Sequence, residues 1–137
     1  MRHRLAPALV LLTIFTWPAA AQQKAGFIDG TYVLSTEGCT KLKALKHGAA
    51  ESIGTVPWSV TAEGISYWEG GCGWSKVKAL GAKRWALTAE CGEDIDTSVE
   101  SYEYTRTSPS TFSVKLTTTG AGAKERKPVS YQRCDVK

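Results

Sequence analysis

The sequence contains no asparagine and only two histidines, and these shortages exclude several kinds of site. Without asparagine the chain offers no acceptor for N-linked glycosylation. It also has no C-x-x-C pair, so the residues that usually hold zinc are scarce. His47 is the one histidine beyond the first few residues, whereas a serine or cysteine nucleophile usually needs a histidine base. We therefore expect no metal site, no cofactor and no catalytic activity.

Long apolar runs are also missing, except for one at the start of the chain. Leu5–Trp17 is apolar apart from two threonines, but about 13 residues are too few to span a bilayer, which takes about 20. Arg2 and Arg4 precede this run, and Pro18 and Ala19–Ala21 follow it. This order is typical of a secretory signal peptide. We expect cleavage after Ala21, no membrane insertion afterwards, and a periplasmic or extracellular product.

The remaining chain suits one domain. We interpret residues 1–21 as the signal peptide, 22–28 as a flexible lead-in and 29–137 as a single domain stapled by disulfides. The formal net charge is +4, and Arg2 and Arg4 supply half of it. This net positive charge is small, and the sequence does not interleave aromatic and basic residues. We therefore do not expect nucleic acid as a partner.

Short stretches that alternate polar and apolar residues recur between turn signals over most of this domain. The predicted strands are Thr31–Ser35, Val56–Thr61, Ile65–Glu69, Trp74–Leu80, Arg84–Cys91, Val99–Arg106, Thr111–Thr117 and Val129–Cys134. One short helix is expected between the first two strands, with Thr36 as its cap and Gly48 at its end. The pattern predicts an all-β fold, a small antiparallel meander barrel or sandwich of about eight strands.

The four cysteines predict two disulfides in an exported chain, and three pairings are possible. Gly81–Lys83 indicates a three-residue hairpin loop between two strands. Pairing across this hairpin brings Cys91 to within one residue of the position opposite Cys72, provided that the Gly71–Gly73 segment bulges. We therefore prefer Cys72–Cys91 and, by exclusion, Cys39–Cys134.

The densest group of unusual residues is Trp68-Glu69-Gly70-Gly71-Cys72-Gly73-Trp74. Glycines allow another backbone or a ligand to approach closely, and an exposed tryptophan is a flat platform for a ligand or partner. The alternative is a bulged strand whose tryptophans fill the core. If the domain has a binding site, we expect Trp68, Glu69, Trp74 and Tyr102 to line it, whereas we assign Trp58 and Trp85 to the core.

An acidic segment contains Glu90, Glu93, Asp94, Asp96, Glu100 and Glu103. Gly92–Thr97 is expected to be a solvated loop, and its spacing does not match an EF-hand. A pair of carboxylates could perform acid–base hydrolysis if Glu69 approached Asp94 or Asp96 across the sheet. Spacing in the sequence does not establish that approach.

Two resemblances to known families arise from short motifs. Gly30-Thr31-Tyr32 on the first strand and the late Arg133 resemble the lipocalin and calycin pattern, in which a Gly-x-Trp packs against an arginine that closes the barrel; here tyrosine replaces tryptophan. This resemblance implies a barrel that holds an apolar ligand. Proteins of this kind also include small exported metalloprotease inhibitors, which block the protease with an N-terminal arm. This sequence differs from those inhibitors in having four cysteines.

The run Trp68–Cys72, together with Cys39 and the terminal Arg133-Cys134, is similar to small exported proteins of Gram-negative bacteria that have no assigned role. That similarity implies a compartment and a size, and it implies no activity. The leading hypothesis is an exported, soluble, non-catalytic binding module for a small molecule or an exported protein. The alternatives are an inhibitor of an exported hydrolase, such as a metalloprotease, with residues 22–28 as its arm, and a small acid–base hydrolase.

Overall fold

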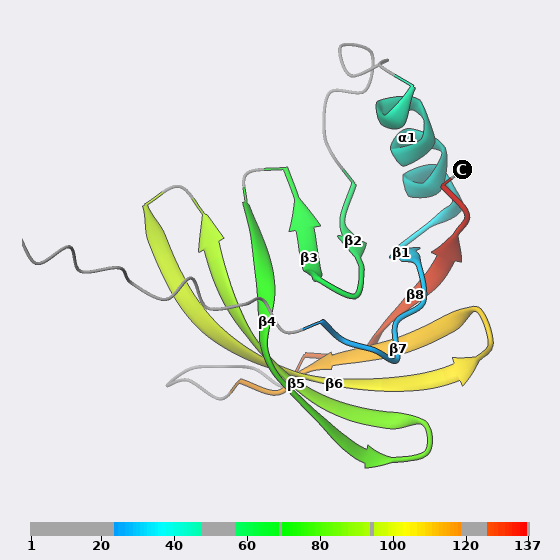
Figure 1. Cartoon of the computed structure of the whole chain (residues 1–137). Coiled ribbons are helices and arrows are strands. Elements are labelled where there is room, and N and C mark those ends of the chain that lie inside the picture. Colours follow the sequence, from blue (N-terminus) through cyan, green and yellow to red (C-terminus); the bar gives the residue numbers. More distant parts are fainter. Residues whose placement is uncertain (1–23, 48–56, 69, 94, 119–125, 137) are drawn as a thin grey trace, which may run out of the picture.

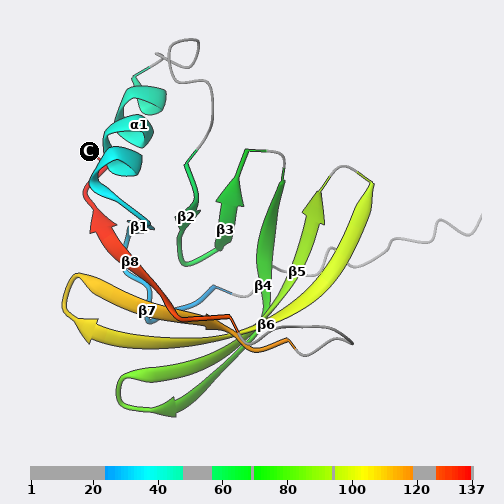
Figure 2. The same ribbon diagram turned by 180° about the vertical axis from the view of Figure 1, so that it is seen from behind.

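Eight antiparallel strands form a closed barrel in which each strand pairs with the next along the chain and β8 pairs with β1 (Figures 1 and 2). The computed structural model describes residues 24–47, 57–68, 70–93, 95–118 and 126–136. The elements are β1 Thr31–Val33, α1 Thr36–Lys46, β2 Ser59–Val60, β3 Gly64–Tyr67, β4 Gly70–Gly81, β5 Arg84–Glu93, β6 Asp96–Ser108, β7 Thr111–Leu116 and β8 Val129–Cys134. The predicted all-β fold with one short helix near the N-terminus is confirmed, as a barrel and not a sandwich.

All eight predicted strands are present, but several boundaries differ. The acidic segment Gly92–Thr97 was expected to be a loop, and that prediction is wrong. β5 extends into it as far as Glu93 and β6 begins at Asp96, and the two strands pair in register from Arg84 opposite Thr105 to Glu93 opposite Asp96. Similarly, Gly70 and Gly71 belong to β4 and do not form a turn, because both pair with β3 and with β5.

Large aromatic side chains fill the half of the barrel that contains the β2–β3 turn and residues 24–28. Trp74, Tyr32, Tyr104 and Phe112 are each only 1% exposed. The indole Nε1 of Trp74 donates to the carbonyl of Thr61 at 3.1 Å, which satisfies its polar group inside the core. Trp74 is therefore a core residue, as in the alternative interpretation of the tryptophan cluster. We call this filled end the base of the barrel.

The segment before β1 closes the base, although the sequence predicted a flexible lead-in. Ala25 and Ile28 are 0% and 4% exposed, and the backbone N–H of Ala25 donates to the carbonyl of Ala62 at 2.6 Å. The ring of Phe27 stacks on Trp85, with centroids 4.2 Å apart. Burial of these side chains makes residues 24–28 part of the folded domain.

Helix α1 lies outside the barrel beside β1 and β8 (Figures 1 and 2). Its N-cap is Ser35, one residue before the predicted Thr36; the Ser35 hydroxyl accepts from the N–H of Gly38 at 3.1 Å. The Cys39–Cys134 disulfide fastens the helix to the end of β8, as predicted. No helix among the described residues is long and apolar enough to cross a membrane.

The second disulfide, Cys72–Cys91, also has the predicted pairing and joins directly opposite positions of β4 and β5. The bulge that permits this register is not at Gly71–Gly73. The register shifts between Trp74 and Lys76, which leaves Ser75 as the extra residue. A second shift near Leu80 leaves a two-residue loop at the hairpin, not the three-residue loop that was predicted.

Gly64 in β3 lets β4 approach, and Gly70 in β4 lets β5 approach, more closely than side chains would allow. A Cβ atom built on Gly64 would lie 1.9 Å from the carbonyl oxygen of Cys72, and one on Gly70 would lie 2.2 Å from that of Gly92. Both contacts are far shorter than van der Waals separation. Close approach of backbones, and not of a ligand, is therefore the role of these two glycines.

Removal of the Cys39–Cys134 disulfide should destabilise the protein strongly. Cys39 and Cys134 are 95 residues apart, and the loop-entropy model gives about 4.7 kcal/mol for a cross-link of that span. We expect the double substitution Cys39→Ala, Cys134→Ala to lower the free energy of unfolding by that amount in urea titrations. Lys43→Ala, an exposed change on the same helix, should change it by less than about 0.5 kcal/mol. Equal unfolding midpoints for the two variants would contradict the prediction.

Gly64→Ala should be among the most damaging single-methyl additions. The new methyl group must displace the β4 backbone, so we expect a loss of about 2–3 kcal/mol in the free energy of unfolding. Gly92→Ala is the matched control, because a Cβ atom there meets nothing within 4 Å. Similar thermal melting temperatures for the two alanine variants would show that β3 and β4 are not held as closely as described.

Candidate functional site

The end of the barrel opposite the base, which we call the mouth, contains a pocket of about 450 Å³. In this antiparallel barrel the mouth is formed by the end of β3, the start of β4, the start of β6, the end of β7 and the start of β8. The lining residues are Trp58, Tyr67, Trp68, Cys72, Glu100, Tyr102, Val114, Leu116, Arg126, Lys127, Val129 and Tyr131. The volume falls in the range of small-molecule sites.

The pocket exists because inward-facing side chains change in kind along β6 and β7. Alternate residues of a strand face the same side of a sheet. On β6 the inward positions are the buried Tyr104 near the base, then Tyr102, then Glu100 toward the mouth. On β7 they are Phe112 near the base and Leu116 toward the mouth. Rings therefore fill one half, while the other half remains open.

Three aromatic side chains form the outer part of the pocket. Trp58 and Trp68 are 47% and 58% exposed, which is unusual for tryptophan. The rings of Trp58 and Tyr67 stack, with centroids 4.7 Å apart and an angle of 18° between their planes. The assignment of Trp58 to the core is therefore wrong: Trp58 immediately precedes β2, and its side chain lies at the mouth.

Glu100 is a carboxylate on the inner face of a strand. Its position opposite Ala89, two residues before Tyr102, places it in the pocket lining, where it is half-buried. The hydroxyl of Tyr102 donates a hydrogen bond to Glu100 Oε2. A carboxylate oxygen and the sulfur atoms of Cys72 and Cys91 lie within 4.8 Å of one another. Because both sulfurs are in a disulfide, they are not thiolate ligands for a metal.

Tyr102 and Tyr131 line the pocket, and the ring of the buried Tyr104 packs against Tyr102. Burial, followed by the hydrogen bond to Glu100, raises the pKa of Tyr102 far above its ordinary value of 10.0. Burial likewise raises the pKa of Tyr131, and that of Tyr104 by a large amount. These phenols therefore stay neutral at physiological pH and keep their protons for hydrogen bonding. The hydroxyl of Tyr104 is buried and has no hydrogen-bond partner among the described residues.

The structure brings together two of the four predicted site residues. Trp68 and Tyr102 both line the mouth pocket. Trp74 lies in the core below it and is not part of the lining. Glu69 lies outside the described residues. Sequence reasoning missed Glu100, although strict alternation with Tyr102 and Tyr104 carried a signal that it faces inward; it also missed Trp58, for which the sequence gives no such signal.

The predicted carboxylate pair is not assembled by the part of the chain that the structure describes. Asp94, like Glu69, falls outside it. Asp96 is exposed at the start of β6 and does not line the pocket. Among the described lining residues, Glu100 is the one carboxylate. Acid–base hydrolysis with two carboxylates thus stays a prediction without a described pair.

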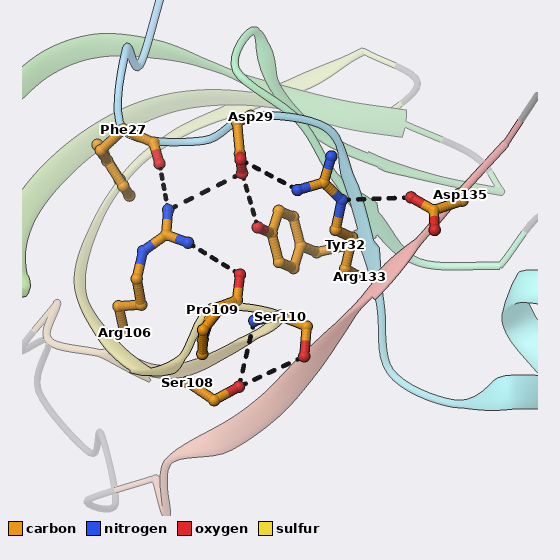
Figure 3. A network of polar contacts seen from close by, with 9 residues as sticks. All are labelled: Phe27, Asp29, Tyr32, Arg106, Ser108, Pro109, Ser110, Arg133 and Asp135. Atoms are coloured by element: carbon orange, nitrogen blue, oxygen red, sulfur yellow. Dashed lines mark hydrogen bonds and ion pairs between the residues drawn. The ribbon is translucent and has the colours of Figure 1, made fainter.

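A polar network closes the barrel at the base (Figure 3). Asp29 accepts a hydrogen bond from the Tyr32 hydroxyl at 2.9 Å and from Arg133 Nη1 at 3.0 Å. Arg106 donates to the carbonyls of Phe27 at 2.6 Å and Pro109 at 3.1 Å. These contacts tie the segment before β1 to the ends of β6 and β8. The arginines are used within the fold, which favours a structural role.

Gly30 belongs to the same corner of the barrel. Its φ of 154° is a conformation that residues with a Cβ rarely adopt, and a Cβ atom there would lie 3.6 Å from the guanidinium of Arg133. Tyr32 pairs directly with Arg133 across β1 and β8. Glycine, tyrosine and arginine of the motif quoted from the sequence are therefore neighbours in space.

Comparisons of the chain with protein-family models, with curated proteins and with solved structures found no match. The resemblances to calycins and to small exported proteins of Gram-negative bacteria therefore stay predictions. Conclusions about function rest on the chemistry of the mouth pocket and of the base network.

The base network should give the stability of the protein a dependence on acid pH. The hydrogen bond from Tyr32, together with the charges of Arg133 and Arg106, holds the pKa of Asp29 below its ordinary value of 3.8. A lowered pKa in the folded state stabilises the protein above the ordinary value, and this contribution is lost as the pH falls through the folded-state pKa. We expect wild type to melt at a higher temperature than Asp29→Asn at pH 6.

That difference in melting temperature should shrink as the pH falls below 3.8 and vanish once the pH is below the folded-state pKa, where Asp29 is protonated in both states. Thermal melts of the two proteins at a series of pH values measure it. A difference that stays constant from pH 6 to pH 2 would mean that the charge of Asp29 does not contribute to the closure of the base.

Proposed function

We propose that this protein is an exported, non-catalytic binding protein that holds a small molecule in the mouth pocket. The observation that carries the proposal is the contrast between the two halves of the barrel. One half is filled by buried rings, whereas the other is a pocket with exposed Trp58 and Trp68 at its edge. Exposed aromatic rings that surround a concave surface are typical of ligand sites.

The polar groups within the pocket support a ligand with hydrogen-bonding groups. Glu100 has accepting capacity beyond its hydrogen bond from Tyr102. The buried hydroxyl of Tyr104 lacks a partner among the described residues. Tyr104 is not part of the lining, but its ring lies 6.3 Å from that of Tyr102, which lines the pocket. Unpaired buried polar groups are costly, and a ligand or bound water would satisfy them.

Export is proposed from the leader and the disulfides together. Arg2, Arg4 and the apolar run Leu5–Trp17 have the composition of a signal peptide. Two disulfides and no free cysteine among the described residues suit an oxidising compartment such as the periplasm. The inhibitor alternative is less favoured, because Ala25, Phe27 and Ile28 of the proposed arm are packed at the base.

A neutral fluorescent dye, N-phenyl-1-naphthylamine, tests the pocket without a charge preference. We expect one saturable site per protein, reported by an increase in dye fluorescence. Leu116→Trp should fill the pocket and weaken the dye affinity at least about tenfold, because the larger side chain occupies the space of the ligand.

Leu80→Trp is the matched control. It makes the same substitution at a residue that is 45% exposed in β4, close to the hairpin at the other end of the barrel. This variant should bind the dye with unchanged affinity. Equal binding by both variants, or binding that does not saturate, would overturn the proposal.

A further inference from the structure

The mouth pocket has charges of opposite sign in different parts. Glu100 is held on the inner face of β6, within reach of Tyr102. Arg126 and Lys127 line the pocket from the segment that enters β8, and both are exposed. Among the described residues, none of these three groups forms an ion pair with another side chain. Each therefore still has charge to offer to a ligand.

The surroundings of Glu100 favour an organic cation. Tyr131 and Tyr67 are close enough to Tyr102 to contribute to its raised pKa, and all three tyrosines line the pocket with Trp58 and Trp68. An ammonium group gains energy both from aromatic rings, whose faces are electron-rich, and from a charge-assisted hydrogen bond to a carboxylate. Tyr102 already donates to Glu100, so the remaining carboxylate oxygen sites call for further donors.

Arg126 and Lys127 narrow the class of ligand. Two cations beside the pocket repel a molecule that carries only positive charge, whereas they attract a carboxylate. A ligand with both charges satisfies both parts of the pocket. The aromatic and aliphatic lining between them, which includes Leu116 and Val129, suits an apolar body.

From this arrangement we infer that the pocket takes a small zwitterion whose ammonium group lies at Glu100, among the aromatic rings, and whose carboxylate lies at Arg126 and Lys127. This inference rests on the proposed function and adds to it the charge pattern of the ligand. Glu100 holds the cation, the rings surround the apolar body, and the two basic residues hold the anion.

Three compounds that share one ring test the charge pattern in the wild-type protein. They are 4-(aminomethyl)benzoate, which is a zwitterion at pH 7, benzylamine, which is a cation, and benzoate, which is an anion. Displacement of N-phenyl-1-naphthylamine reports their affinities. We expect the zwitterion to bind about fivefold to tenfold more tightly than benzylamine and more tightly still than benzoate.

Substitutions that remove a charge but leave a polar side chain assign each charge to its residue. Glu100→Gln should abolish the advantage of 4-(aminomethyl)benzoate over benzoate, and the double substitution Arg126→Gln, Lys127→Gln should abolish its advantage over benzylamine. Lys76→Gln, an exposed change on β4 outside the pocket lining, is the control and should change neither ratio. Thermal melts and dye binding confirm that each variant is folded.

The outcomes separate this inference from the proposed function. If the dye binds the pocket but the three compounds compete equally, or if benzoate competes best, the inference is overturned and the binding function stands. Retention of the wild-type order of affinities in folded Glu100→Gln also overturns it. If Leu116→Trp fails to weaken dye binding, the proposed function itself fails.

Discussion

The pairing of β1 with β8 closes the sheet, and the rest of the structure depends on this closure. The contact is short, since β1 has only three residues, opposite Cys134, Arg133 and Gln132. Three other constraints reinforce it: the Cys39–Cys134 disulfide, the Asp29–Arg133 ion pair, and the packing of residues 24–28 across the base. A closed sheet removes the edge strands that would otherwise invite aggregation.

Closure also determines where a ligand could bind. An eight-stranded barrel has an interior that side chains can just fill. In this protein Trp74, Tyr104 and Phe112 fill it at the base, where edge-to-face contacts hold their rings 5.7–6.1 Å apart. The same strands carry smaller or polar residues toward the mouth. The pocket is thus a consequence of how side-chain size is distributed along β6 and β7, and not of a separate structural element.

Local rules of the sequence were sufficient to predict that the eight strands are present and how the cysteines pair. Alternation places Leu87, Ala89 and Cys91 on one face of β5, and all three are buried as expected. The disulfide pairing followed from hairpin geometry even though the bulge is at Ser75, because one extra residue anywhere between the loop and Cys72 corrects the register.

The positions of single aromatic residues did not follow from such rules. Trp58 and Trp74 have similar local surroundings in sequence, yet one is exposed and the other buried. What distinguishes them is the tertiary structure: Trp74 finds a carbonyl for its indole N–H at the base, whereas Trp58 finds the ring of Tyr67 at the mouth. Sequence reasoning likewise could not foresee that Ala25 and Ile28 are buried, because their partners are distant along the chain.

The residues that violate the rules of folding are concentrated in one half of the barrel. A carboxylate at an inward position reduces stability relative to an apolar residue, and two exposed tryptophans reduce solubility relative to polar residues. The Cys72–Cys91 disulfide lies beside Glu100 and holds β4 and β5 in place there. Natural proteins tolerate such violations mainly at functional sites. Their concentration at the mouth, and the satisfied network at the base, explain why the ligand is proposed to bind at the mouth.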